Sequence, residues 1–129
     1  MQESNSPESD SLPGTPLVPI TIGTEEHRIA FKMKLYKGFE AEYKKRHAAL
    51  WPDLKGLLKS IGISEYSIFF DETTDDLFCI MKADNPDALK ELPFNTVMKK
   101  WWSYMKDIME TNDDDSPVSI PLKEIFYLP

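Results

Sequence analysis

The stretch ISEYSIFFDETTDDLFCIMKA, residues 63–83, decides the fold. Its two halves, Ile63–Asp71 and Leu77–Ala83, are rich in the aromatic and branched side chains that favour β-strands. The five residues between them, Glu72–Asp76, are all polar and suit a turn. The pattern therefore predicts an antiparallel hairpin near the middle of the chain.

Helical patterns lie on both sides of this hairpin. From about Phe39 to Ile61, apolar residues recur at spacings of three and four, which predicts a helix with one apolar face. Pro52 lies inside that segment and should bend its axis, because proline lacks the amide hydrogen that a helix needs. After the hairpin we expect a short helical piece following Pro86 and a longer helix from about Phe94 to Met109.

Strand patterns occur at the two ends of the folded part. Ile29, Phe31, Met33 and Leu35 alternate with Ala30, Lys32 and Lys34, the period-2 pattern of a half-buried strand. Leu122–Leu128 should form the closing strand. The predicted order β-α-β-β-α-β is the ferredoxin-like α+β arrangement, with both helices on one face of an antiparallel sheet. We expect a homodimer, because the other sheet face would be uncovered and partly apolar.

Residues 1–25 have a different composition from the rest of the chain. They are rich in Ser, Pro, Glu and Thr and lack Lys and Arg, and such a segment cannot bury enough apolar surface to fold. We therefore predict a disordered N-terminal extension over 1–25 and one folded domain over 26–129, a size typical of single domains.

Composition excludes several functional classes. The net charge is −7 over 129 residues and −3 over residues 26–129, so no dense positive surface for nucleic acid is expected. No apolar run reaches the roughly 18–20 residues of a membrane span, and no secretory signal pattern is present at the start. Cys79 is the only cysteine, which fits a reducing compartment and a soluble cytoplasmic protein. With only two histidines beside it, we expect no metal site.

Tyr43 and His47 form the first candidate site. Residues four apart on a helix share a face, so both side chains can reach one cleft. Histidine can take or give a proton near neutral pH, and the tyrosine hydroxyl can donate and accept hydrogen bonds. The same spacing also fits a core histidine with a satisfied hydrogen bond, so spacing alone leaves both interpretations open.

Aromatic residues form the second candidate site. Trp101 and Trp102 are consecutive, so on a helix their side chains point about 100° apart. One can serve the core while the other lines a cavity, where an indole suits the apolar patches of a sugar ring. Tyr66 shares a strand face with Ile68 and Phe70, a position from which its hydroxyl can reach the same cleft. Packing alone would also account for all three.

Several separated motifs resemble those of the L-rhamnose mutarotase family. They occur in the same order over about residues 28–129: Arg46-His47, Trp51-Pro52, Tyr66, Trp101-Trp102-x-Tyr104-Met105, Ser116-Pro117-Val118-Ser119 and Phe126-Tyr127-Leu128-Pro129. The family consists of dimeric ferredoxin-like α+β barrels that interconvert the α and β anomers of L-rhamnose without a cofactor.

The resemblance implies roles for the candidate residues. His47 would be the proton donor at the ring oxygen, and Tyr43, Tyr66, Trp101 and Trp102 would bind the sugar. The general base stays unassigned, with Tyr43, an acidic loop residue and bound water as alternatives. The chain departs from the family pattern at Ala48-Ala49, where Asn-Pro is frequent, and at Asp115, where Asn is frequent. Both departures concern the sugar preferred rather than the type of reaction.

Two other functional classes are compatible with this fold, because a fold does not fix a function. One is a sugar-binding or regulatory domain without catalysis. The other is a cofactor-independent monooxygenase-like enzyme with the same dimeric barrel, which would need an apolar pocket. The combination of tyrosine, histidine and two tryptophans suits a polyol better than an apolar substrate.

Overall fold

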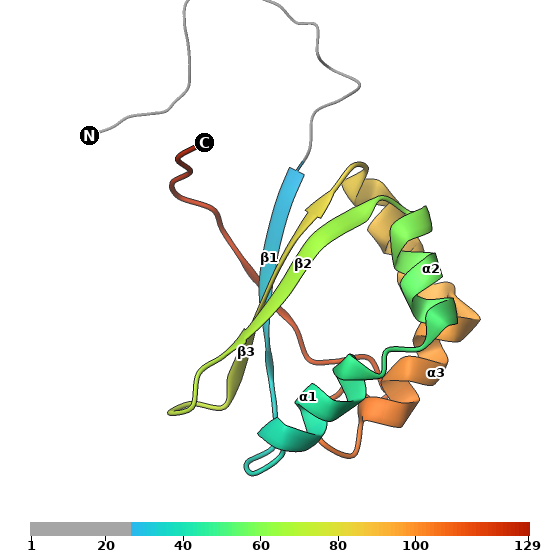
Figure 1. The fold of residues 1–129 in the computed structure, drawn as a ribbon, viewed down its shortest axis with the longest axis vertical. Helices are drawn as coiled ribbons and strands as arrows, with labels where there is room; N and C mark the ends of the chain where they lie inside the picture. Colours follow the sequence, from blue (N-terminus) through green and yellow to red (C-terminus); the bar gives the residue numbers. More distant parts are fainter. Residues whose placement is uncertain (1–26) are drawn as a thin grey trace, which may run out of the picture. The chain divides into compact units, whose positions relative to one another are not determined.

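An antiparallel four-stranded sheet forms one layer of the protein, and the helices cover one of its faces (Figure 1). The structure, a computed structural model, describes residues 27–129, so the extension expected over 1–25 lies outside the described residues. The strands are β1 (His27–Lys34), β2 (Ile63–Phe70), β3 (Asp76–Ala83) and β4 (Ile120–Leu122), in the spatial order β2-β3-β1-β4. The helices are α1 (Glu40–Ala48), α2 (Pro52–Ser60), the 3-10 helix η2 (Pro86–Phe94) and α3 (Thr96–Met105). This order confirms the predicted ferredoxin-like α+β fold.

The helix expected over residues 39–61 is in fact two helices. α1 ends at Ala48, and α2 begins at Pro52 after a short connection. The prediction of a bend was wrong because a residue before proline is kept out of the helical region by the proline ring. Trp51 accordingly has φ −59° and ψ 132°, an extended conformation. Pro52 occupies the first turn of α2, where no amide hydrogen is required.

The long helix expected from Phe94 to Met109 is shorter at both ends. Asn95 caps α3, and its side-chain oxygen accepts hydrogen bonds from the amides of Val97 (2.9 Å) and Met98 (3.3 Å). Phe94 belongs to η2 instead. At the other end α3 stops at Met105, and Met109 forms an isolated β-bridge with Leu35.

The last strand was placed too far along the chain. β4 covers Ile120–Leu122, and Leu122 pairs with Ala30 of β1. β1 begins at His27, only three residues before Ala30, so an antiparallel strand reaching Leu128 would run past its partner. Lys123–Pro129 fall outside the compact unit Glu26–Leu122 and contain no helix or strand.

A bulge in β2 sets which face Tyr66 occupies. Ser64 pairs with Lys82 and Ser67 with Ile80, so Glu65 and Tyr66 together oppose Met81. Glu65 has a positive φ of 47°, as one residue of a bulge often does. Because an extra residue reverses the alternation of side chains, Tyr66 joins the face that points toward the helices.

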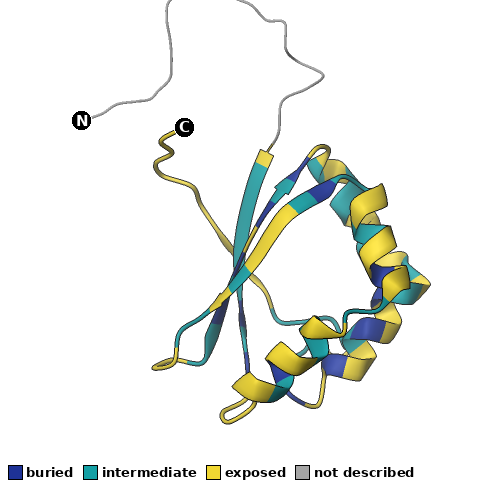
Figure 2. Cartoon of the chain, in the orientation of Figure 1, coloured by how far each residue is buried: buried dark blue, intermediate teal, exposed yellow. Residues whose placement is uncertain are grey.

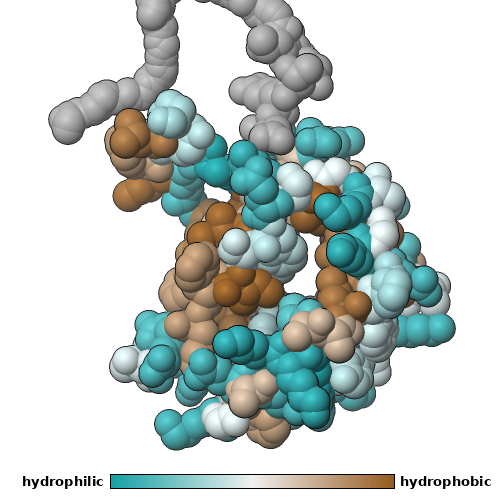
Figure 3. Space-filling view, viewed as in Figure 1, coloured by the Kyte–Doolittle hydropathy of each residue, from teal (hydrophilic) through white to brown (hydrophobic). Residues whose placement is uncertain are grey.

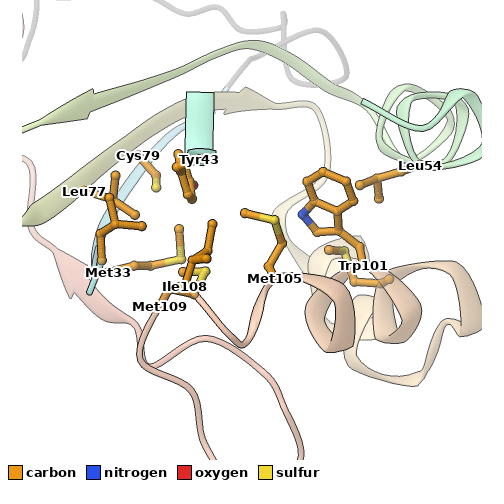
Figure 4. Packing of buried hydrophobic residues seen from close by; sticks show 11 residues of the cluster. Met33, Tyr43, Leu54, Leu77, Cys79, Trp101, Met105, Ile108 and Met109 are labelled. Atoms are coloured by element: carbon orange, nitrogen blue, oxygen red, sulfur yellow. The ribbon is translucent and has the colours of Figure 1, made fainter. Parts of the chain in front are cut away.

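The buried residues lie between the sheet and the helix layer (Figure 2). Figure 4 shows Met33, Leu77 and Cys79 from the sheet facing Met105, Ile108 and Met109 from the end of α3 and the turn after it. Tyr43 of α1 and Trp101 of α3 belong to the same cluster, which therefore includes two of the predicted site residues. Among the described residues, no helix has the length and apolar character needed to cross a membrane.

Candidate active site

A cavity of about 310 Å³ lies between the inner face of the sheet and the helices. All five predicted site residues line it: Tyr43, His47, Tyr66, Trp101 and Trp102. Figure 3 shows an opening between the two layers with hydrophobic residues at its edges. A second cavity of about 420 Å³ shares Tyr43, His47 and Tyr66 but neither tryptophan. The fold thus brings side chains from α1, β2 and α3 around one space.

His47 is held by its own helix. Its Nδ1 lies 3.0 Å from the backbone oxygen of Tyr43, one turn earlier. A carbonyl oxygen can only accept, so Nδ1 carries the proton and Nε2 keeps a free lone pair. The imidazole stacks on the Tyr43 ring, with centroids 4.3 Å apart and planes 29° apart. The spacing of four residues thus fixes both the tautomer and the orientation of His47.

Burial keeps the polar groups of this site uncharged. Desolvation lowers the pKa of His47, although the hydrogen bond to the Tyr43 carbonyl acts in the opposite direction. Desolvation also raises the pKa of the Tyr43 phenol, with a smaller contribution from nearby Cys79. At pH 7 the site therefore presents a neutral imidazole beside a protonated phenol.

Trp101 also contacts His47 and is itself packed by two further aromatic residues. Trp101 meets the imidazole edge-on, with centroids 5.4 Å apart and planes at 90°. Trp51, from the connection between α1 and α2, meets Trp101 edge-on at 5.0 Å, and Tyr104 contacts both indoles. Trp101 is buried and Trp102 half-buried, and both line the cavity. Trp51-Pro52 was among the family motifs, but no sequence pattern indicates that Trp51 packs against Trp101.

Arg46 joins the two helices that carry the site. Its guanidinium binds Asp107 through two hydrogen bonds, at 2.9 and 3.1 Å, and donates to the backbone oxygen of Tyr104 at 2.8 Å. It also binds Glu42 at 2.8 Å and lies 4.5 Å from the centre of the Tyr104 ring. These hydrogen bonds raise the pKa of Arg46, so the charge is permanent. The contacts connect α1, which carries His47, to the end of α3, which carries Trp101.

Tyr66 completes the cavity from the sheet. The residue is 37% exposed, but its hydroxyl end is enclosed near Cys79 and Tyr43. Desolvation therefore raises the pKa of Tyr66, and a hydrogen bond with Cys79 contributes to the shift. Burial likewise raises the pKa of the Cys79 thiol to about 11, so it stays protonated at neutral pH.

The cavity also contains residues that the sequence did not single out. All five methionines after Met1 line it: Met33, Met81, Met98, Met105 and Met109. Ser116 and Ser119, from the loop before β4, line it as well. The methionines are scattered along the chain, so only the fold brings them together. The two serines were visible as part of a family motif without an assigned role.

The described residues contain no group of three or more His, Cys, Asp or Glu side chains positioned to hold a metal ion.

Comparisons with known proteins agree with this geometry. A family model described as L-rhamnose mutarotase matches residues 28–128. The L-rhamnose mutarotase of Formosa agariphila is 55% identical over 101 residues, which cover 78% of this chain and 97% of that protein. The L-rhamnose mutarotase of Bacteroides thetaiotaomicron is 52% identical over 101 residues, with the same coverage of both chains.

A solved structure extends the similarity to three dimensions. The crystal structure of L-rhamnose mutarotase from Formosa agariphila superimposes with a TM-score of 0.74 at 54% identity. The match covers 80% of this chain and 99% of that chain, so it includes the elements that surround the cavity. By sequence and by fold, the chain belongs to the L-rhamnose mutarotase family.

Proposed function

We propose that this protein interconverts the α and β anomers of L-rhamnose, or of a closely similar hexose, by acid–base ring opening and reclosure. The observation that carries the proposal is the neutral His47, whose Nδ1 is held by the Tyr43 carbonyl beside the cavity. Nε2 is then available to a sugar. Relatives about half identical to this chain are named L-rhamnose mutarotases, which supports the same activity.

His47 can act first as base and then as acid. Nε2 takes the proton of the anomeric hydroxyl, and the electrons of that O–H bond form the C1=O1 double bond. The bond between C1 and the ring oxygen breaks, and the imidazolium gives its proton to that oxygen. Both sugar oxygens are attached to C1, so one imidazole reaches both. Rotation about C1–C2 and the reverse steps on the other carbonyl face give the other anomer.

In this mechanism the other four residues bind the sugar. Tyr43 and Tyr66 stay protonated because burial raises the pKa of both phenols, so each can donate a hydrogen bond to a sugar oxygen. They are therefore unsuited to the role of general base at neutral pH. Trp101 and Trp102 offer indole faces to the apolar side of the ring and N–H groups to hydroxyls. Because only protons move, no cofactor is needed.

The methionines favour a deoxy sugar. L-Rhamnose carries a methyl group where an ordinary hexose carries a hydroxymethyl group, and the thioether side chains around the cavity are apolar and adaptable. A hydroxyl buried against them would lack a hydrogen-bond partner, which is unfavourable. This apolar wall also fits the pocket expected of a monooxygenase-like enzyme, but the tyrosines and histidine would then have no use.

We further propose that the active protein is a homodimer formed through the outer face of the sheet. Phe69, Ile80, Ile120 and Leu122 are all exposed there. They come from the two edge strands and β3, and the strand register places them in adjacent rows on the face opposite the helices. A second copy would cover this apolar patch with the same patch of its own. The cytoplasmic location and the absence of nucleic-acid partners stay sequence-based predictions.

Saturation-transfer NMR on equilibrated L-rhamnose tests the proposed activity. Irradiation of one anomeric proton should reduce the signal of the other anomer much faster with the protein than without it. A sugar-binding domain without catalysis would broaden or shift the sugar signals and leave exchange at its background rate. That result would contradict the proposal.

A further inference from the structure

The loop before β4 carries two serines that line the cavity, Ser116 and Ser119. Hydroxyls are suitable partners for a sugar because each can donate one hydrogen bond and accept others. The two serines differ in whether their hydroxyls are already engaged.

Ser116 belongs to the internal hydrogen bonding of its loop. Its hydroxyl donates to a carboxylate oxygen of Asp114 and accepts from the side-chain amide of Asn112 at 3.0 Å. The backbone of Asn112 donates to the Ser116 carbonyl at 2.7 Å, and Asp115 between them has a positive φ of 72°. The Ser116 hydroxyl therefore stabilises the loop and has little remaining capacity for a ligand.

Within residues 27–129, the Ser119 hydroxyl makes no hydrogen bond. The strand register fixes the side on which it lies. Ile120 and Leu122 pair with Lys32 and Ala30 and face outward, whereas Pro121 pairs with Phe31 on the inner face. Because side chains alternate along a strand, Ser119 lies on the same side as Pro121, toward the helices. Ser119 lines the cavity, which agrees with this alternation.

Ser119 and Tyr66 are at opposite edges of the sheet. β2, which carries Tyr66, is one edge strand, and β4, which directly follows Ser119, is the other. Three strand spacings, about 14 Å, separate the two edges. The register also offsets the two residues along the strands by four positions, about 13 Å, because Tyr66 opposes Met81 whereas Ser119 precedes Ile120, the partner of Lys32. Both residues nevertheless line the same cavity of about 310 Å³, which extends along this diagonal of the sheet. The inner-face residues of β1 and β3 that line the space between them are apolar: Phe31, Met33 and Met81.

We propose that Ser119 is a sugar-binding residue that hydrogen-bonds a ring hydroxyl remote from the anomeric carbon. This inference rests on the proposed function, which places the anomeric carbon at His47. His47 and Tyr66 line both the cavity of about 310 Å³ and the neighbouring one of about 420 Å³, and Tyr66 belongs to β2, the edge strand opposite β4. A sugar with C1 at His47 presents its C3 and C4 hydroxyls toward β4. Ser119 is the polar side chain on that side whose hydroxyl is not engaged within residues 27–129.

The test compares Ser119→Ala with two matched variants. One neutral hydrogen bond contributes about 0.5–1.5 kcal/mol net, so Ser119→Ala should raise KM for L-rhamnose about twofold to tenfold. Exchange at saturating sugar and Tm should change little. Ser116→Ala should instead lower Tm, because it removes a support of the loop. Ser103→Ala, an exposed serine of α3 outside the cavity lining, should change neither quantity.

Deoxy sugars identify the hydroxyl and separate binding from a structural effect. If Ser119 binds the C4 hydroxyl, wild type and Ser119→Ala should show the same KM for 4-deoxy-L-rhamnose and different KM values for 3-deoxy-L-rhamnose. If Ser119 binds the C3 hydroxyl, the two proteins should show the same KM for 3-deoxy-L-rhamnose and different KM values for 4-deoxy-L-rhamnose. A Ser119→Ala protein with unchanged KM for L-rhamnose, or with a KM ratio that is the same for all three sugars, would overturn the proposal. Calorimetric affinity for L-rhamnose tests the contact even if wild type fails to accelerate exchange, in which case the proposed function alone fails.

Discussion

Among single residues, His47 has its tautomer and ring orientation set by the helical turn that precedes it. The Tyr43 carbonyl takes the Nδ1 proton, and burial favours the neutral ring. The sequence predicted that Tyr43 and His47 share one face of a helix, and that Tyr66 shares a strand face with Ile68 and Phe70. The reason for that face, the bulge at Glu65, could not be predicted, because a left-handed residue other than glycine leaves no clear sequence signal.

The lowered pKa of His47 predicts how activity depends on pH. The mechanism begins with a neutral imidazole, so the catalysed part of the exchange should be constant near pH 7 and fall below the lowered pKa, under pH 6.5. The measurement is a pH profile of saturation transfer with the protein-free rate subtracted at each pH. A catalysed rate that increases as pH falls from 7 to 5 would show that the imidazolium begins the reaction instead.

The same shift predicts a change in stability. Because the folded pKa of His47 lies below the unfolded value, the unfolded chain binds more protons at mildly acidic pH. This contribution to stability is fully present above pH 6.5 and is lost as pH falls toward the folded pKa. The free energy of unfolding, measured with urea at a series of pH values, should therefore fall more steeply with decreasing pH for the wild type than for His47→Asn over this window. The prediction fails if the two pH dependences are parallel.

At the scale of helices and strands, the sequence predicted which elements form better than where they end. All four strands and both helical regions were found, whereas the helix break at Pro52 and the end of β4 were misplaced. Both errors have the same cause. The local pattern reports which residues are apolar, but the end of an element depends on neighbours such as the proline ring or the length of the paired strand.

The glycines of α2 and of the turn after it should respond oppositely to alanine. Gly62 has φ +90°, and a β-carbon there would lie 3.0 Å from the Asp84 β-carbon. Gly62→Ala should therefore destabilise the fold by about 1–2 kcal/mol or more. Gly56 lies inside α2 with nothing within 4 Å of an added β-carbon. Gly56→Ala should stabilise by about 0.5–1 kcal/mol.

Thermal unfolding of the two variants provides the check. A change of 1 kcal/mol shifts Tm by roughly 4–8 °C in a domain of about this size, so the opposite directions are easily resolved. Equal Tm values for Gly62→Ala and wild type would contradict the left-handed conformation of Gly62 and its close approach to Asp84.

At the scale of the whole molecule, the outer sheet face is the feature that a single chain leaves unexplained. The sequence predicted an uncovered face, and the structure places Phe69 there with 61% of its surface exposed. The partner could not be read from one chain, because alternation reveals an apolar face but not what covers it.

Oligomeric state is predicted to depend on that face. Light scattering of the wild type should give about twice the 14.9 kDa mass of the chain. Phe69→Glu should give a monomer, because it places a carboxylate within the apolar patch, on the edge strand β2. Phe94→Glu is the matched control, since Phe94 is also highly exposed but belongs to η2 in the helix layer. A wild type that stays monomeric at micromolar concentration would contradict the dimer.

Proton transfer by His47 is tested by the substitution His47→Asn. Asparagine keeps a polar side chain but cannot take up a proton near neutral pH. His27→Asn, at the exposed start of β1, is the matched control and should behave as wild type. The measurement is saturation transfer at saturating L-rhamnose, with affinity and Tm determined on the same preparations. We predict catalysed exchange lower by about 10²-fold or more, with affinity changed far less. A stable, sugar-binding His47→Asn protein with undiminished exchange would show that His47 does not transfer the proton.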